Sequence, residues 1–194
     1  MRKAKVNRKT SETDVSIDLN LDGTGMFKID TAIPFLDHML QLFTMHGLFD
    51  LAVSARGDIE VDYHHLMEDI GITLGEAIVK AVGGKEGIQR YGSALIPMDE
   101  SLAEVVIDLS GRPFLAYKVK AYKGAVRDLE VSLFEDFFRA VSNHAMMNLH
   151  IMVRHGRDLH HIYEAIFKAF GRSLSTAVTV DKKRKGVPST KGTL

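Results

Sequence analysis

Two adjacent histidines, followed three residues later by a glutamate, form a motif that occurs twice in the sequence and strongly restricts the possible folds. The first copy is His64–Glu68 and the second is His160–Glu164, and both read His-His-x-x-Glu. With only 9 histidines among 194 residues, two such copies are not expected by chance. The pair therefore indicates an internal duplication or a shared function.

Helix geometry gives each copy of the motif two separate faces. On an α-helix the first histidine and the glutamate are four residues apart and share one face, whereas the second histidine points about 100° away. One metal ion can therefore be bound by His64 with Glu68, while His65 must contact a different ion. If the two copies face each other across a pseudo-twofold axis, each lends its second histidine to the ion held by the other. We therefore predict a dinuclear, or at least two-metal, centre.

Composition excludes several classes of protein. The 25 basic and 25 acidic residues leave no net charge, which argues against a nucleic-acid or anionic-membrane partner. There is no cysteine, so disulfides and thiol nucleophiles are excluded and any metal site must use histidines and carboxylates. The chain starts with charged residues and contains no run of eighteen apolar residues. We expect a cytoplasmic protein.

Apolar periodicity predicts the same succession of elements in both halves of the chain. Turn residues separate these elements, and glycines end the two helices expected in the first half. In the first half we expect a hairpin of strands Val15–Leu21 and Met26–Asp30, a helix Phe35–Gly47, short strands Leu51–Val53 and Ile59–Val61, and a motif helix capped by Asp62 and ending at Gly83. In the second half we expect strands Val105–Leu109 and Phe114–Val119, a helix Leu129–Met147, a strand Leu149–Val153, and the second motif helix ending near Ala177.

This order predicts an α+β fold of two duplicated half-domains, each an antiparallel-rich sheet with helices on one face. The repeat aligns His38 with Asp136, and His46 with His144. We place the first half-domain at residues 1–88 and the second at 89–180. Residues 181–194 lack periodicity and form a C-terminal tail.

Several stretches resemble the imidazoleglycerol-phosphate dehydratase family of histidine biosynthesis, and the resemblance covers nearly the whole chain. The stretches that carry it are Phe35–Leu40, Asp62–Asp69, Pro97–Glu100, Ser110–Pro113, Gly156–Ala169 and Pro188–Gly192. The resemblance implies a duplicated α+β half-domain, two Mn²⁺ per active site, and loss of water from imidazole glycerol phosphate to give imidazole acetol phosphate. It also implies a homo-oligomer of 24 subunits with active sites at subunit contacts.

The resemblance assigns the metal ligands in two sets. One Mn²⁺ would be bound by His38, His65, His160 and Glu164, and the other by His64, Glu68 and His161. This division agrees with the crossed pairing that helix geometry suggests. The remaining ligand of the second ion is a histidine in several relatives, where this chain has Asp136. A carboxylate can also bind manganese, so we count Asp136 among the ligands.

A second group of residues is expected to bind the substrate. Lys168 follows Glu164 by one helical turn, on the ligand face of its helix, where a cation without an anionic partner would repel metal ions. A phosphate group on the substrate would resolve that conflict. The resemblance assigns phosphate binding to Arg90, Arg112, Lys168, Ser189 and Lys191, and bidentate arginines suit that role. His38, His46, His64 and His160 are expected to line the substrate site.

The reaction that the resemblance implies removes a proton from a carbon that has no neighbouring carbonyl, so the imidazole ring would have to accept the electrons. Glu12 is the candidate base, and Glu68 and Glu164 are the other carboxylates expected at the reacting centre. Two alternatives compete with this prediction. A two-metal phosphohydrolase would use the same metals and cations, and a non-catalytic metal-binding cage would use the ligands without the convergent cations.

Overall fold

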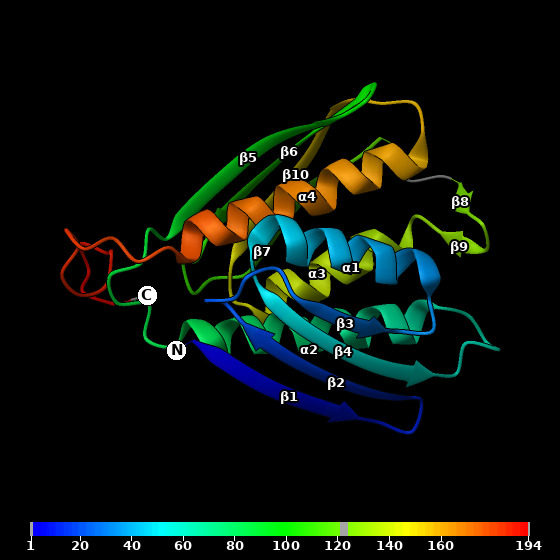
Figure 1. Cartoon of the computed structure of the whole chain (residues 1–194), viewed down its shortest axis with the longest axis horizontal. Helices are drawn as coiled ribbons and strands as arrows, with labels where there is room; N and C mark the ends of the chain where they lie inside the picture. The colour runs from blue at the N-terminus through cyan, green and yellow to red at the C-terminus, as the bar shows by residue number, and fades with distance from the viewer. Residues whose placement is uncertain (1, 121–123, 194) are drawn as a thin grey trace.

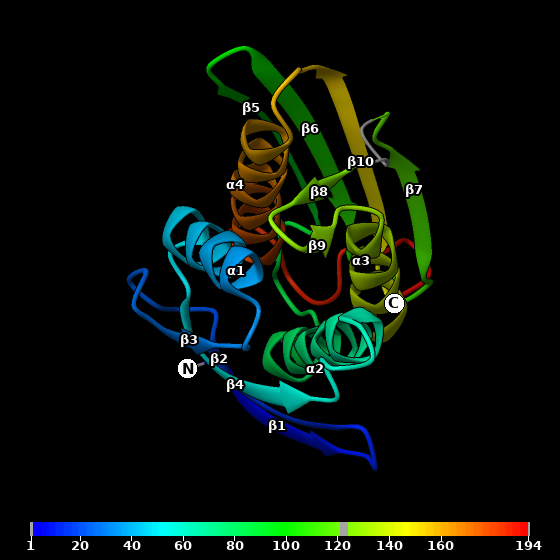
Figure 2. The same ribbon diagram turned by 90° about the vertical axis from the view of Figure 1, so that its right-hand side faces the viewer.

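Figures 1 and 2 show two four-stranded sheets with four helices packed between them in a computed structural model, which describes residues 2–120 and 124–193. Each sheet turns one face to the helices and the other to the surface. Within these residues no helix is both long enough and apolar enough to cross a membrane.

The first sheet is built from the first half of the chain. Its strands lie in the order β1-β2-β4-β3, and only the β3–β4 pair is parallel. Helix α1 connects this parallel pair, and α2 follows β4 and packs under β1 and β2. The bounds are β1 Lys3–Lys9, β2 Thr13–Asn20, β3 Phe27–Asp30, α1 Pro34–Gly47, β4 Asp50–Gly57 and α2 His64–Val82.

The second sheet repeats this topology. Its order is β5-β6-β10-β7, and again only the pair joined by a crossover helix, β7–β10, is parallel. A short hairpin, β8–β9, is inserted before α3 and has no counterpart in the first half. The bounds are β5 Tyr91–Met98, β6 Ser101–Asp108, β7 Phe114–Lys118, β8 Ala125–Val126, β9 Leu129–Glu130, α3 Leu133–His144, β10 Asn148–His155 and α4 Leu159–Val178. The predicted α+β fold with a duplicated half-domain is confirmed.

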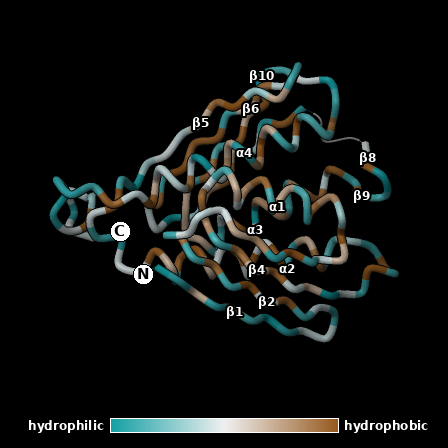
Figure 3. The backbone as a smooth tube through the Cα atoms, in the orientation of Figure 1, coloured by the Kyte–Doolittle hydropathy of each residue, from teal (hydrophilic) through white to brown (hydrophobic). Residues whose placement is uncertain are grey.

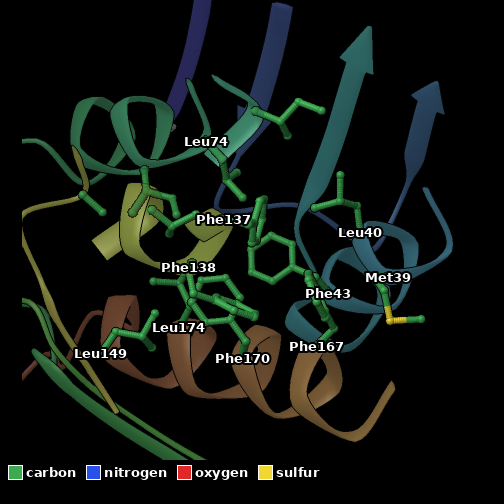
Figure 4. Close-up of a cluster of buried hydrophobic side chains, with 14 of the residues drawn as sticks. Met39, Leu40, Phe43, Leu74, Phe137, Phe138, Leu149, Phe167, Phe170 and Leu174 are labelled. Atoms are coloured by element: carbon green, nitrogen blue, oxygen red, sulfur yellow. The ribbon is translucent and has the colours of Figure 1, made fainter. Parts of the chain in front are cut away.

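The hydrophobic core lies between the sheets and is continuous through both halves. Figure 4 shows that Phe137 and Phe138 of α3 meet Phe167 and Phe170 of α4, next to Phe43 of α1. All five rings are fully buried. The tube coloured by hydropathy follows the same division, with hydrophilic residues along the edge strand β1 and apolar ones on the inner elements (Figure 3). Because the core spans both halves, the relative position of the four helices is fixed by packing.

Two helix pairs approach closely through glycines. Helix α4 packs on α1 at Gly171, where an added Cβ would lie 2.3 Å from the Phe43 carbonyl oxygen. Helix α2 packs on α3 at Gly71 and Gly75, where a Cβ would lie 2.6 Å and 2.8 Å from backbone carbonyl oxygens. Each motif helix is therefore paired with the crossover helix of one half: α4 with α1, and α2 with α3.

Several sequence-based boundaries differ from the structure. The predicted hairpin of β2 and β3 does not exist, because β4 lies between these strands. The strand expected at Ile59–Val61 is a turn, and helix α3 begins at Leu133 because β9 occupies the start of the expected segment. The first strand of each sheet, β1 and β5, was not predicted from the sequence.

Candidate active site

Three of the predicted metal ligands lie together where α1 crosses α4. Glu164 Oε1 is 2.9 Å from His38 Nε2 and 3.0 Å from His160 Nε2. The ligand atoms of all three residues lie within 4.8 Å of one another, and this is the one such group of histidines and carboxylates among the described residues. The first histidine and the glutamate of the second motif thus share a helix face, as the helical spacing predicts.

Glu164 is the anchor of this cluster. It is only 8% exposed, and its second oxygen, Oε2, accepts a hydrogen bond from Lys168 Nζ at 2.6 Å. Burial raises the pKa of Glu164, but the Lys168 ammonium and the two histidine rings outweigh burial and lower the pKa to about 2. The carboxylate is therefore ionised at neutral pH, with one oxygen directed at the two histidines. Lys168 also contacts Met98 Sδ at 3.2 Å, which holds its chain along α4.

The first motif occupies the other helix pair. His64 Nδ1 lies 3.8 Å from Asp136 Oδ2, so α2–α3 packing brings the first histidine of the motif close to the carboxylate that replaces a histidine of several relatives. Glu68 is exposed on the same helix. This separation is too long for a hydrogen bond, so His64 and Asp136 do not bind each other, and both groups are available to a metal ion.

An aspartate fixes the start of each motif helix. Asp158 is the N-cap of α4 and accepts hydrogen bonds from the backbone amides of His160 and His161. Asp62 accepts one from the His64 amide at 2.7 Å, one position before the N-cap Tyr63. The prediction of Asp62 as the cap was therefore off by one residue, although its carboxylate has the capping role.

The second histidine of each motif points away from these clusters. His65 Nδ1 is 3.0 Å from Asp58 Oδ2 and 3.8 Å from Glu12 Oε2. His161 Nδ1 is 2.8 Å from Glu100 Oε2. The carboxylate beside each ring raises the pKa of that histidine. One chain therefore does not gather either complete ligand set among its described residues.

The predicted phosphate-binding residues lie in two separate places. Arg90 is at the far end of α4, because its amide donates to the carbonyl of Ala177. At 1.5 Å per residue this is about 13 Å along the helix from Lys168. The Arg90 side chain is held by Asp108 at 2.7 Å and by the carbonyl of Pro188 at 2.9 Å.

The contacts of Arg90 draw the C-terminal tail toward it. Ser189 follows Pro188 directly, and its hydroxyl accepts the amide of Lys191 at 3.2 Å. Arg112 lies in the turn after β6, with its guanidinium near the Ser110 carbonyl at 3.4 Å. The C-terminal tail and the end of β6 thus bring Arg90 and Ser189 together at the C-terminal end of α4. Lys168 instead lies beside Glu164.

His46 lines a separate groove between α1, α4 and β5, with a volume of 430 Å³. Arg172, Ser93 and Ser175 line the same groove. Burial and the nearby charges of Lys168 and Arg172 lower the pKa of His46, so this ring is neutral around pH 7. His46 therefore lies near Lys168 and Arg172 of α4.

Sequence reasoning missed three groups next to these residues. Asp58 and Glu100 contact the second histidines, and the motif spacing indicates neither carboxylate. Lys85 is only 8% exposed and makes no ion pair within the described residues. Burial lowers its pKa, although Asp108 opposes that shift. Glu100 belongs to the stretch Pro97–Glu100, and its place in the short turn between β5 and β6 is the sequence feature that could have pointed to it.

Fold and site together define an α+β enzyme with a duplicated half-domain, whose histidine and carboxylate clusters lie at the starts of two related helices. Solved structures share this architecture. Imidazoleglycerol-phosphate dehydratase from Staphylococcus aureus matches with a TM-score of 0.83 at 40% identity, covering 92% of this chain and 99% of its own. IGPD from Pyrococcus furiosus in complex with (S)-C348 matches with a TM-score of 0.84 at 36% identity, covering 97% and 100%.

Sequence comparison leads to the same family. The family model for imidazoleglycerol-phosphate dehydratase matches residues 31–174. The enzymes of that name from Thermodesulfovibrio yellowstonii and Trichlorobacter lovleyi are 56% and 54% identical, with 100% of this chain covered in both and 100% and 99% of theirs. The chain belongs to the imidazoleglycerol-phosphate dehydratase family. It is accordingly a hydro-lyase of histidine biosynthesis.

Proposed function

We propose that the protein removes water from imidazole glycerol phosphate to give imidazole acetol phosphate, with two Mn²⁺ in each active site. The observation that carries this proposal is the cluster of His38, His160 and Glu164 with Lys168 beside it. Such a cluster offers two imidazole nitrogens and one anionic oxygen to a metal, and a cation to a substrate anion.

The residues present fit a manganese ion. One oxygen of Glu164 lies within hydrogen-bond distance of both ring nitrogens, so the three ligand atoms already converge. The carboxylate oxygen suits Mn²⁺, and no thiolate is present to favour a softer ion. His64, Glu68 and Asp136 offer a second donor set of the same chemistry. When bound, the two ions would withdraw electrons from the imidazole ring of the substrate and so acidify the adjacent carbon.

The remaining roles fall to side chains of this chain. Glu12 would accept the carbon-bound proton; it lies at the start of β2, half exposed and 3.8 Å from His65. Lys168 would neutralise negative charge beside Glu164. Lys168 would also hold the phosphate, together with Arg90, Arg112, Ser189 and Lys191, and the guanidinium of Arg90 would exchange its present contacts for phosphate oxygens.

We also propose that these sites are completed between subunits of a homo-oligomer of 24 chains. One chain supplies His38, His160 and Glu164 to the first ion, and we assign the missing His65 to a neighbouring copy. His161 would join the second set in the same way. The separation of about 13 Å along α4 between Lys168 and the Arg90 end supports the same conclusion for the phosphate site.

The direct test is incubation of the protein with imidazole glycerol phosphate and Mn²⁺. The proposal predicts formation of the enolisable ketone imidazole acetol phosphate without release of phosphate. Free inorganic phosphate would instead identify a two-metal phosphohydrolase. No conversion, with both ions bound, would favour a metal-binding cage.

Assembly provides a second test. Because metal ions that bridge chains contribute their binding free energy to assembly, removing them with a chelator should break the oligomer into smaller units. Ligand histidines must be neutral to bind, so lowering the pH below about 6.5 should act in the same direction. Sedimentation velocity should show smaller units that Mn²⁺ reassembles at neutral pH. An unchanged mass after metal analysis confirms that both sites are empty would refute the bridging role.

A further inference from the structure

His65 and His161, the second histidines of the two motifs, make the same kind of contact with a carboxylate. Their predicted role as metal ligands does not explain this contact. Each ring has a carboxylate on Nδ1: Asp58 Oδ2 at 3.0 Å from His65, and Glu100 Oε2 at 2.8 Å from His161. The two carboxylates come from unrelated positions, because Asp58 follows β4 and Glu100 lies in the turn between β5 and β6. Duplication alone therefore does not account for the match.

The contact decides which ring nitrogen carries the proton. An ionised carboxylate only accepts hydrogen bonds, so Nδ1 must donate and therefore keeps its proton. In a neutral ring the other nitrogen, Nε2, then has a free lone pair. Around His161 Nε2 the neighbouring charged group is the exposed Asp99, whose oxygen is 3.9 Å away and beyond hydrogen-bond distance. The lone pair of Nε2 thus stays available to a metal ion.

We propose that Glu100 and Asp58 are positioning residues that fix the Nδ1-protonated form of His161 and His65 and so present Nε2 of each ring to a metal ion. This inference rests on the proposed metal-dependent function. A partner of this kind also fixes the ring orientation and increases the basicity of the metal-binding nitrogen.

The two carboxylates differ in how firmly they are held. Oε1 of Glu100 accepts the backbone amides of Arg157 and Asp158 at 3.1 Å and 2.8 Å, and the Ser101 hydroxyl at 3.1 Å. Its Oε2 is left for His161. Oδ1 of Asp58, in contrast, is buried without any hydrogen-bond partner, the one such side-chain atom in the described part of the chain. Glu100 is therefore fixed in one orientation, whereas no donor on Oδ1 holds Asp58.

This difference makes Glu100→Gln a sharp test. A glutamine has one oxygen, and the two backbone donors of the loop keep that oxygen in the Oε1 position. Its NH₂ group then faces His161 and donates to Nδ1, which moves the ring proton to Nε2 and blocks metal binding there. In Asp58→Asn the amide is free to turn its oxygen toward His65, so the correct form of the ring is retained.

The experiment is a Mn²⁺ titration of chelator-treated protein, with free Mn²⁺ followed by electron paramagnetic resonance. The wild type should bind two ions per chain. Glu100→Gln should weaken one of the two by about 10- to 100-fold, and Asp58→Asn should have a smaller effect on the other. Nitrogen-15 spectra of the metal-free protein should show the His161 proton on Nδ1 in the wild type and on Nε2 in Glu100→Gln.

Two controls separate positioning from simple bracing of the loop. Glu100→Ala removes the loop contacts as well, so it should lower the thermal midpoint, whereas Glu100→Gln should not. Glu76→Gln changes a carboxylate 3.9 Å from His144, which is not a predicted ligand, and should leave both ions bound. Wild-type affinities in Glu100→Gln, or a metal loss that tracks an equal fall in midpoint in both Glu100 variants, would overturn the inference. Failure of the wild type to bind Mn²⁺ would instead refute the proposed function.

Discussion

Replacing Gly171 with alanine should loosen the first metal site without touching any ligand. The added Cβ would lie 2.3 Å from the Phe43 carbonyl oxygen and 3.1 Å from the Gly47 amide nitrogen, whereas ordinary contacts are 3.4 Å or more. Both neighbours are helix backbone and cannot rotate away. Helices α1 and α4 must therefore separate by about 1 Å at this point, a typical response to an overpacked core.

The same movement reaches the cluster two turns away. Gly171 and Glu164 are about 10 Å apart along α4, and Phe43 and His38 are closer still along α1. A uniform separation would lengthen the present contact of 2.9 Å between His38 Nε2 and Glu164 Oε1 to about 4 Å. In a metal site, the distances between the ion and its ligand atoms deviate by only about 0.2 Å from their usual values. We expect Mn²⁺ affinity at this site to fall by about 10-fold or more, since errors of about 1 Å in a constellation can cost about 100-fold.

Stability should fall less than the clash alone suggests. Overpacking costs about 1 to 3 kcal/mol, but alanine is favoured over glycine inside a helix by about 1 kcal/mol. The net loss is therefore about 0 to 2 kcal/mol, which corresponds to a fall of at most about 8 °C in the midpoint of the metal-free protein.

The assay combines a Mn²⁺ titration with thermal unfolding. Gly84→Ala is the matched control, because an added Cβ there meets nothing within 4 Å. Gly75→Ala forces α2 from α3 and should weaken the second ion instead of the first. A Gly171→Ala variant that loses stability yet binds both ions with wild-type affinity would show that helix spacing does not set the ligand geometry.

Two further predictions concern single side chains. Glu12→Gln should keep both ions and bind substrate normally while kcat falls by about 10²- to 10⁴-fold, because only a proton acceptor is lost; near-normal kcat would remove Glu12 from the mechanism. Burial and the neighbouring Tyr163 raise the pKa of Tyr117 well above its usual value. A raised pKa in the folded state stabilises below the unfolded pKa, and this contribution is lost as pH rises toward the folded value. Urea unfolding of the metal-free protein should therefore show stability falling above about pH 10, and less steeply in Tyr117→Phe; equal slopes would contradict this assignment.

Elements with strong local signals could be predicted from the sequence, and elements defined by long-range pairing could not. Helices α1, α2 and α4 have a continuous apolar face, and glycines mark the ends of α1 and α2, so the predicted ends of these helices are nearly correct. Strand β1 has one buried residue, Val6, because it is a charged edge strand with no apolar alternation to detect. The β2–β3 hairpin was wrong for a different reason. The chain does turn, at Leu21 and Asp22, but β4 lies between the two strands, and no local pattern encodes that insertion.

The same distinction holds within the site. The spacing of the motif correctly put His160 and Glu164 on one helix face, because four residues make slightly more than one turn of about 3.6 residues. The partners of the second histidines could not be derived this way. Glu100 reaches His161 from a turn between strands, and Asp58 reaches His65 from the loop before α2, so both contacts depend on the tertiary fold.

Helix pairing within one chain gives the crossed ligand sets a physical basis. The glycine contacts fix α4 against α1 and α2 against α3, so each pair contributes the first histidine of one motif and a ligand from its crossover helix. The second histidines contact carboxylates on other loops, at 3.0 Å for His65 and 2.8 Å for His161, so neither ring joins the opposite pair of the same chain. If both ions bind, we therefore expect the missing nitrogens to come from a neighbouring copy. Metal affinity and subunit assembly would then be one linked equilibrium, in which Glu100→Gln should weaken the oligomer as well as the ion.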